Sequence, residues 1–285
     1  MTILCYTKED VMNKIGVLIG LRPNTDIFEE MKKVHDMGCE CCQINIWHTS
    51  LYTDEMAANI VKAAKEYNVE ISTLWAGWSG PQEWNFTAGP STLGIVPEAY
   101  RMKRAEEIIM GARFAAKIGV PRVATHAGFL PENSNDPAYG GIIAVLRYIA
   151  RSCQNHGRYF LFETGQETPT TLLRVIEDIG LDNLGINMDT ANLILYGKAN
   201  SADAITVFGK YVMDTHIKDG LYPTNGKHLG REVKVGEGFA NIPEVVKRLR
   251  EVGYTGNYVI EREIKGDQQI KDIIDTVAYL KNILN

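Results

Sequence analysis

Four segments in the second half of the sequence resemble buried strands, and each delivers a potential metal ligand near its end. LFET contains Glu163, NMDT contains Asp189, THIK contains His216, and VIERE contains Glu261 and Glu263. If these segments are neighbouring parallel strands, their side chains meet at one rim of the sheet. Carboxylates brought together repel one another unless a cation lies among them. This oxygen-rich set with one imidazole favours a divalent cation, with Mn²⁺ as the first choice and Co²⁺, Mg²⁺ or Zn²⁺ as alternatives.

The segment DTHIKDG adds a second sign of chemistry, because Asp214, His216 and Lys218 alternate along it. On a strand these three side chains point to one face, and ionisable groups on a buried face need a reason. Taken singly, each predicted ligand also has an ordinary explanation: Asp189, for example, is a residue type that caps helices. The joint placement on four consecutive strands favours the metal site. Within VIERE we prefer Glu261 as the ligand because it lies deeper in the apolar run.

The elements that would position these residues alternate regularly along the chain. Eight segments have the composition of strands: NKIGVLIG, CCQINIW, VEISTLWAG, RVATHAG, RYFLFET, LGINMDT, VMDTHIKD and NYVIERE. Amphipathic patterns such as DIFEEMKKVHDMG separate them, and several end at a glycine, namely Gly38, Gly119, Gly180 and Gly253. The alternation predicts an α/β fold, a single (β/α)₈ TIM barrel domain over residues 1–285. A doubly wound open sheet is the alternative.

Two long connections, residues 76–97 and 220–241, each follow a predicted strand. They would therefore lie over the carboxyl end of the barrel, where barrel active sites form. The first is rich in tryptophan, and we expect Trp75 to contact a substrate, with Trp78 and Trp84 closing the site against water. Trp47 and His48, after the second predicted strand, are similar candidates. Filling of the core is the competing explanation for these aromatic side chains.

Composition limits the class of protein. The 285 residues carry 30 Lys and Arg against 35 Asp and Glu, a formal charge of −5 without a basic tract, so nucleic acid is not an expected partner. No apolar run is long enough to span a membrane. The first residues lack the pattern of a secretory signal, so we expect a cytoplasmic protein. The five cysteines show no zinc-site spacing and are expected to be small buried residues.

The segments LFETGQE, INMDTAN, THIKDG, REVKVGEG and GYTGNYVIERE resemble the sugar isomerase and epimerase superfamily of xylose isomerase-like barrels. This superfamily includes ketose 3-epimerases, inosose dehydratases and hydroxypyruvate isomerases. The resemblance extends from about the second strand to the C-terminus and is most specific over residues 160–263. It implies that Glu163, Asp189, His216 and Glu261 bind one divalent metal. It also implies a sugar epimerase or isomerase in which the two glutamates act as acid and base on a metal-stabilised enediolate.

The resemblance also implies substrate contacts outside the metal set. His126 in RVATHAG matches a histidine of the fourth strand, Lys218 belongs to an HxKD pattern, and Arg231 precedes the VGEG turn. Asn192 stands three positions after Asp189, where ketose 3-epimerases commonly have a histidine, and we expect it to contact the substrate. Tyr222 stands where an arginine is often found. These departures leave the identity of the sugar open.

Three further expectations concern ligands and partners. VGEGFANIP places Gly236 and Gly238 before a helix that Asn241 would cap, but no basic cluster accompanies them, so we expect an unphosphorylated sugar or polyol-derived substrate. A homo-oligomer is compatible with the resemblance. The alternative functions are an inosose-type dehydratase and a metal- and sugar-binding barrel subunit of a larger complex. The endonuclease IV branch is disfavoured because it needs more well-placed histidines than His126 and His216.

Overall fold

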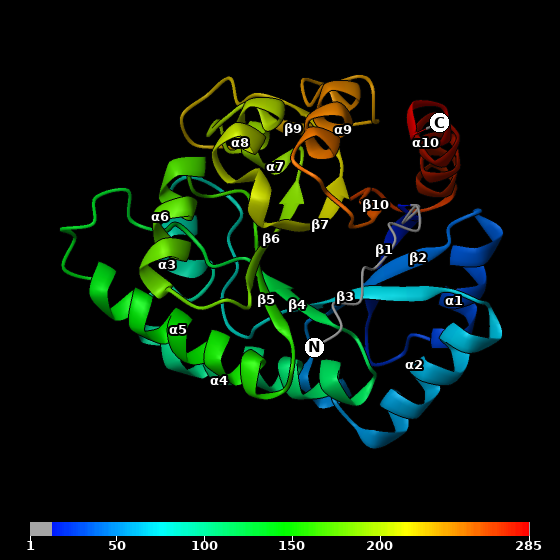
Figure 1. Cartoon of the computed structure of the whole chain (residues 1–285), viewed down its shortest axis with the longest axis horizontal. Helices are drawn as coiled ribbons and strands as arrows, with labels where there is room; N and C mark the ends of the chain where they lie inside the picture. The colour runs from blue at the N-terminus through cyan, green and yellow to red at the C-terminus, as the bar shows by residue number, and fades with distance from the viewer. Residues whose placement is uncertain (1–12, 285) are drawn as a thin grey trace, which may run out of the picture.

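Eight parallel strands form a closed barrel in the computed structural model, which describes residues 13–284. Around the barrel the order is β1, β2, β3, β4, β5, β6, β7 and β10, with β10 pairing back to β1 (Figure 1). The strands are β1 (Ile15–Leu21), β2 (Cys41–Ile46), β3 (Glu70–Ala76), β4 (Arg122–Thr125), β5 (Tyr159–Glu163), β6 (Leu184–Asp189), β7 (Val212–Ile217) and β10 (Tyr258–Ile260). All eight predicted strands are confirmed, and closure excludes the doubly wound alternative.

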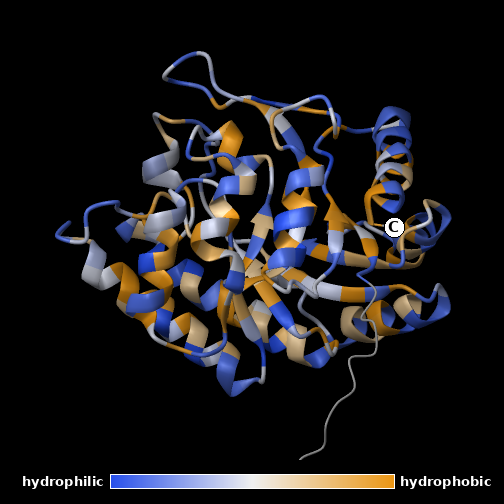
Figure 2. Ribbon diagram, turned by 45° about the horizontal axis from the view of Figure 1, so that its top comes forward, coloured by the Kyte–Doolittle hydropathy of each residue, from blue (hydrophilic) through white to orange (hydrophobic). Residues whose placement is uncertain are grey.

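Helices follow the strands and surround the barrel (Figure 1). They are α1 (Ile27–Asp36), α2 (Asp54–Glu66), α3 (Gly89–Thr92), α4 (Glu98–Lys117), α5 (Tyr139–Asn155), α6 (Pro169–Ile179), α7 (Asn192–Leu195), α8 (Ser201–Phe208), α9 (Ile242–Glu251) and α10 (Asp267–Leu284). Figure 2 shows hydrophobic and hydrophilic residues interspersed along these helices. In α1, Ile27, Met31 and Val34 are buried, which is the spacing of a helix face packed on a barrel.

The helix ends follow local backbone chemistry. Asp26 caps α1 by accepting hydrogen bonds from the main-chain N–H groups of Phe28 and Glu29. The residues predicted to end helices, Gly38, Gly119, Gly180 and Gly253, have φ values of +77°, +75°, +64° and +80°, a region that favours glycine. Asn241 precedes α9, but its side chain makes no capping hydrogen bond, so its predicted capping role is wrong. Its φ of +50° turns the side chain away from the usual N-cap conformation.

The two long connections lie at the carboxyl ends of their strands, as predicted. The loop after β3 contains α3, and the loop after β7 contains an antiparallel hairpin of β8 (Asp219–Leu221) and β9 (Arg231–Val233). The loops meet where the main-chain N–H of Phe86 donates to the carbonyl of Lys227. They therefore form a joint cover over part of the barrel mouth.

The remaining composition-based predictions can be checked within residues 13–284. Cys39, Cys41, Cys42 and Cys153 are buried free thiols, which confirms the expectation for them, and Cys5 lies outside the described residues. Within the same residues, no helix combines the length and hydrophobicity needed to cross a membrane.

Candidate metal and substrate site

The four predicted ligands come together at the carboxyl rim of the barrel. Glu163 ends β5, Asp189 ends β6, His216 lies on β7, and Glu261 directly follows β10. Asp189 is paired with His216 in the β6–β7 register, which sets these two side chains at one height. One ligand atom from each of the four residues lies within 4.8 Å of the others. The second glutamate of VIERE, Glu263, is more exposed than Glu261 and lies outside this group.

The imidazole of His216 is oriented from below by the barrel interior. Its Nε2 lies 2.8 Å from Gln43 Oε1, and Gln43 Nε2 donates to Asn187 Oδ1 at 2.8 Å. Because the amide of Gln43 uses its nitrogen as the donor to Asn187, its oxygen accepts from the Nε2–H of His216. The other ring nitrogen, Nδ1, faces the carboxylates, 3.1 Å from Glu163 Oε1 and 3.4 Å from Glu261 Oε2. Against the effect of burial, these carboxylates raise the pKa of His216 well above its ordinary value. Loss of the Nδ1 proton on metal binding would leave Nδ1 as a ligand.

Lys218 supplies a buried positive charge to the same group. Its Nζ lies 3.0 Å from Asp189 Oδ2, 2.9 Å from Glu261 Oε2 and 3.0 Å from Glu263 Oε1. Burial works to lower the pKa of Lys218, but the surrounding carboxylates outweigh it and raise this pKa well above its ordinary value. The ammonium group thus offsets the negative charge that three clustered carboxylates would otherwise leave uncompensated.

The donor set fits a divalent cation. Asp189 Oδ1 accepts from the main-chain N–H groups of Ala191 and Asn192. Its fully buried Oδ2 makes no hydrogen bond within residues 13–284, and it lies 3.0 Å from Lys218 Nζ and 3.9 Å from His216 Nδ1. A buried carboxylate oxygen left without a hydrogen bond is suited to bind a cation. Carboxylate oxygens with one imidazole match the preferences of Mn²⁺ and Mg²⁺ better than a structural zinc shell.

The electrostatics differ among the carboxylates. Burial works to raise the pKa of Glu163 and of Glu261, but nearby positive groups prevail and hold both pKa values below the ordinary range. For Glu163 the main positive group is His216, and for Glu261 the positive groups are Lys218 and His216. Burial dominates at Asp189 and raises its pKa well above the ordinary value. Both glutamates are therefore held ionised, which suits groups that bind cations.

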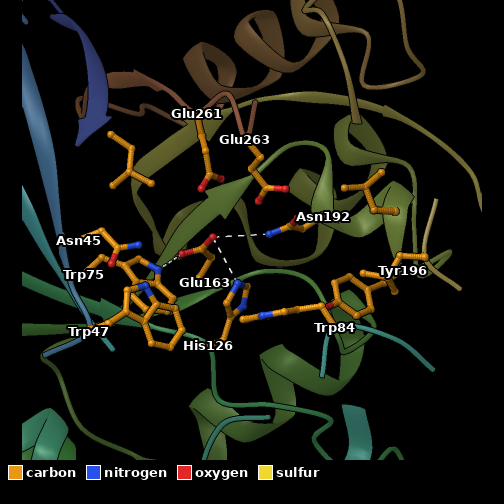
Figure 3. Close-up of a pocket in the computed structure, with 13 residues that line it drawn as sticks. Asn45, Trp47, Trp75, Trp84, His126, Glu163, Asn192, Tyr196, Glu261 and Glu263 are labelled. Atoms are coloured by element: carbon orange, nitrogen blue, oxygen red, sulfur yellow. Dashed lines mark hydrogen bonds and ion pairs between the residues drawn. The ribbon is translucent and has the colours of Figure 1, made fainter. Parts of the chain in front are cut away.

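A cavity of about 410 Å³ opens above the donor set. Its walls include the glutamates Glu163 and Glu261, several aromatic side chains and a few polar groups (Figure 3). The lining residues are Leu18, Asn45, Trp47, Trp75, Trp84, His126, Glu163, Asn192, Leu195, Tyr196, Leu229, Glu261 and Glu263. This volume and this mixture of apolar walls with few polar groups are typical of small-molecule sites.

Three predicted substrate-contacting residues surround Glu163 in this cavity (Figure 3). The indole N–H of Trp75 donates to Glu163 Oε2, while His126 Nε2 and Asn192 Nδ2 each lie 3.5 Å from Glu163 Oε1. Burial lowers the pKa of His126, so its imidazole is neutral at pH 7. These contacts hold the carboxylate of Glu163 in one orientation toward the cavity.

Arg231 and Lys218 are predicted substrate contacts that do not line the cavity; Lys218 is buried beneath it among the carboxylates, whereas Arg231 lies away from the site. It is exposed on β9, where it pairs with Leu221 in the hairpin. The antiparallel pairing of β8 with β9 fixes the loop in a register that leaves this side chain at the surface. Tyr222 is likewise exposed.

The main-chain N–H groups of the glycine turn in VGEGFANIP already bind a carboxylate of the protein. Asp219 accepts hydrogen bonds through Oδ2 from the N–H groups of Gly236 and Gly238, both at 3.0 Å. Through Oδ1 it accepts from Gly220 at 2.8 Å and Ala240 at 2.9 Å. An added Cβ at Gly238 would collide with this carboxylate. The N–H groups are thus committed to an internal anion and are not free for a substrate phosphate.

Gln43, Asn45 and Tyr196 belong to the site but were not predicted. Gln43 and Asn45 alternate within the otherwise apolar strand CCQINIW, so they share one face. Two polar side chains on the inward face of a barrel strand could have been predicted as site residues, because buried polar groups require partners. Tyr196 lies just after the short helix α7 and gives no comparable signal in the sequence.

The protein is a closed α/β barrel with an oxygen-rich donor set at its carboxyl rim. Comparison with known proteins identifies the family. Residues 31–283 match the model of the xylose isomerase-like TIM barrel family, so the chain belongs to that family. The family expected from the motifs is thereby confirmed.

Individual relatives extend this assignment. The uncharacterized protein MJ1311 from Methanocaldococcus jannaschii is 27% identical over 173 residues, which are 57% of this chain and 56% of that protein. The alignment thus spans about half the length of that relative. A xylose isomerase domain protein from Planctomyces limnophilus has a similar structure, with a TM-score of 0.87 and 31% identity over 94% of this chain and 96% of that one.

Two more distant structures share the fold. A D-tagatose 3-epimerase-like protein matches with a TM-score of 0.71 and 22% identity, over 95% of this chain and 97% of that one. The 3-keto-D-glucoside 4-epimerase YcjR from E. coli matches with a TM-score of 0.71 and 18% identity, over 95% of this chain and 99% of that one. At these identities the likeness shows the fold alone.

Proposed function

We propose that this protein is a divalent-metal-dependent epimerase or isomerase of a keto sugar, with Glu163 and Glu261 as the acid and base. The observation that carries the proposal is that both glutamates belong to the four-residue donor set and also line the cavity above it. They enter from β5 and from the end of β10, so they approach a ligand from different sides (Figure 3). The sugar epimerases among the structural neighbours support this choice of substrate class.

The proposed metal ligands are Glu163, Asp189, His216 and Glu261, with Mn²⁺ as the preferred ion. When bound, a divalent cation would polarise a carbonyl and its neighbouring hydroxyl, and thereby acidify the C–H bond between them. Asp189 Oδ2, which makes no hydrogen bond within residues 13–284, and His216 Nδ1, which lies 3.9 Å from it, support this ligand set.

The proton transfers fall to the two glutamates. One glutamate, as a carboxylate, takes the proton from the acidified carbon. The other must carry a proton when the substrate binds, and it donates this proton to the resulting enediolate. Return to the opposite face of the same carbon gives epimerisation, whereas return to the adjacent carbon gives aldose–ketose isomerisation. Trp75, His126 and Asn192 keep Glu163 aimed at the cavity. We further propose that Lys218 and Asn192 bind substrate oxygens, because both lie beside these carboxylates.

Deuterium incorporation in D₂O tests the proposal. The protein is incubated with Mn²⁺ and a panel containing D-fructose, D-tagatose, D-psicose, an inosose and hydroxypyruvate, then Mn²⁺ is removed before NMR and mass spectrometry. We expect label at a carbon next to a carbonyl, loss of labelling with EDTA, and a fall of about 10²- to 10⁴-fold in Glu163→Gln. Arg231→Gln, a substitution at the exposed hairpin, is the control.

The same experiment separates the competing reactions. The position of the label distinguishes epimerisation from isomerisation, and loss of water from the product would reassign the protein as a dehydratase. Tight Mn²⁺ binding without exchange in any substrate would overturn the proposed reaction and favour a barrel that only binds its ligands.

A further inference from the structure

A second cavity adjoins the first at the barrel mouth. It has a volume of about 570 Å³ and lies above β1, β2 and β3, away from the metal-binding residues. Asn45 and Trp47 line both cavities, so the two spaces are separated by no more than these shared side chains. A single sugar ring held over Glu163 and Glu261 would leave the second cavity empty.

The wall of the second cavity is fixed by two buried side chains of α4. Arg104 is fully buried, and its guanidinium donates to the carbonyls of Ser79, Pro81, Thr92 and Gly94. Its Cζ also lies 4.3 Å from the ring centre of Trp78. Four hydrogen bonds from one rigid group thus tie the loop after β3 into a single shape.

Glu107 completes this support. Its carboxylate accepts from the main-chain N–H of Ser79 at 2.8 Å and from the Ser79 hydroxyl at 2.6 Å. A loop tied down by buried charged groups at so many points is preformed, because each of these groups would be left unpaired if the loop moved. The second cavity is therefore preformed in the folded protein.

The side chains around the second cavity suit a hydroxylated ring. Trp47 offers apolar aromatic surface, with the buried ring of Trp78 packed behind it, and His48, Gln82 and Arg22 offer hydrogen bonds. Gln82 uses its amide nitrogen to donate to the carbonyl of Trp78 at 2.9 Å, which leaves its oxygen to accept from a ligand hydroxyl. Sugar rings combine apolar C–H faces with hydroxyl edges, which is the chemistry that such walls complement.

An anionic substituent fits these walls less well. Arg22 is the one permanently charged side chain among the lining residues of this cavity, and it is exposed. Phosphate sites usually combine several cationic groups or a cluster of free main-chain N–H groups. The balance of one cation against several neutral donors and acceptors favours an uncharged ligand.

We propose that the second cavity binds a second sugar ring, so that the substrate is a glycosylated keto sugar and not a free monosaccharide. The reacting ring lies over the proposed metal ligands, and the attached ring lies against Trp47. This inference deepens the proposed function and rests on it for the identity of the reacting ring.

Saturation-transfer NMR with disaccharides tests the inference independently of catalysis. The probes are lactulose, turanose and isomaltulose, which carry a second ring on different oxygens of a ketose, with D-fructose as the one-ring reference. Binding is measured with Mg²⁺ on the wild-type protein, which keeps all four proposed metal ligands. We expect the protons of the second ring to receive saturation with at least one disaccharide, and that disaccharide to bind more tightly than D-fructose.

The double variant His48→Ala/Gln82→Ala identifies the cavity involved. We expect it to weaken disaccharide binding about tenfold more than D-fructose binding, the loss expected from one or two neutral hydrogen bonds. The matched control is His35→Ala/Gln154→Ala, two exposed positions on outer helices. The same reduction in both variants would overturn the inference, as would absence of saturation in the second ring of all three disaccharides.

The failure of this inference is distinguishable from the failure of the proposed reaction. Deuterium exchange in monosaccharides together with unsaturated second rings would retain the epimerase or isomerase and overturn the second-ring site. Saturated second rings that depend on His48 and Gln82, without exchange in any sugar, would retain the site and overturn the reaction.

Discussion

The two halves of the barrel mouth carry different kinds of side chain. The half formed by β5, β6, β7 and β10 carries Glu163, Asp189, His216 and Glu261, with the ammonium of Lys218 among them. The half formed by β2, β3 and the loop after β3 carries Trp47, Trp75, Trp78 and Trp84, whose rings pack on one another. One half concentrates charge, and the other presents neutral aromatic surface.

This difference separates two tasks. Buried charges shift one another's pKa values and bind cations, so the charged half is suited to move protons. The aromatic half has few titratable groups and is held by hydrogen bonds from Arg104 and Glu107, so it is suited to hold a ligand in place. Substitutions in the charged half should therefore affect metal binding and electrostatics, whereas those in the aromatic half should affect affinity.

The largest expected effect is that of Lys218→Met on the metal-free protein. Without the ammonium, Asp189 and Glu261 lose the cation that lies about 3 Å from each of them. Breaking a buried ion pair at one partner typically destabilises by about 3–5 kcal/mol. We expect this loss in chemical unfolding with EDTA at pH 7, and a larger stabilisation by Mn²⁺ than in the wild type, because the metal replaces the missing charge.

Lys117→Met is the control for this prediction. Lys117 pairs with Asp54 at the surface, where an ion pair contributes about 0–1 kcal/mol. Equal stability of Lys218→Met and the wild type in EDTA would show that the charged half does not depend on its internal cation.

Gln43→Met tests how the two halves are connected, because Gln43 reaches from β2 to the metal-binding imidazole. The substitution removes the acceptor of His216 Nε2 while keeping similar side-chain volume. Loss of such an outer partner typically weakens metal binding by about 10- to 100-fold. Calorimetric titration with Mn²⁺ measures the change, with Gln154→Met on the outer helix α5 as the control. An unchanged Kd would indicate that His216 is oriented by other contacts.

The charged half was largely predictable from the sequence, whereas for the aromatic half the tryptophans were predicted but the contacts that hold them in place were not. Ligands at the ends of consecutive strands follow from strand periodicity, because the barrel repeats one unit and brings equivalent positions to one rim. The eight strands themselves were readable for the same reason. By contrast, Arg104 lies in an ordinary helical pattern, and nothing in its spacing shows that it ties down a loop more than ten residues earlier in the chain.

Arg231 illustrates the same limit. Its place before a glycine turn suggested a substrate contact, but the β8–β9 register points it to the surface. Local patterns fix which residues lie on strands, whereas the path of a long loop depends on tertiary contacts such as the Asp219 carboxylate bound by the N–H groups of Gly236 and Gly238. The second cavity is a product of such loops and was invisible in the sequence.

Glu167→Gln sharpens the comparison within the charged half, because Glu167 is buried without a compensating cation in contact. Its Oε1 has no hydrogen-bond partner in residues 13–284, and burial raises its pKa to about 8. Between its ordinary pKa and about 8, the folded protein holds a proton that the unfolded chain has released, so stability falls as pH rises. This fall in the free energy of unfolding amounts to about 1.4 kcal/mol per pH unit, and we expect it to be absent in the variant.

The measurement is the difference in unfolding free energy between the wild type and Glu167→Gln from pH 5 to pH 8. The variant should match the wild type near pH 5, where Glu167 is protonated in the folded protein, and gain relative stability as pH increases. A constant difference over this range would mean that Glu167 is already ionised in the folded protein.

The smallest expected effect lies in the aromatic half. Trp84 is 39% exposed and packs its ring 5.4 Å from His126 and 6.4 Å from Trp78, between centroids. In Trp84→Leu the loss of aromatic contact is about 0.5–1.5 kcal/mol, which is roughly a 2- to 13-fold rise in KM for the sugar that shows deuterium exchange. Tyr148→Leu, at an exposed aromatic residue on α5, is the control. Because Trp84 makes no hydrogen bond to Glu163 or Glu261 within residues 13–284, kcat should change far less than KM. A fall in kcat at constant KM would instead mean that Trp84 stabilises the transition state. The aromatic half would then take part in the reaction as well as in substrate binding.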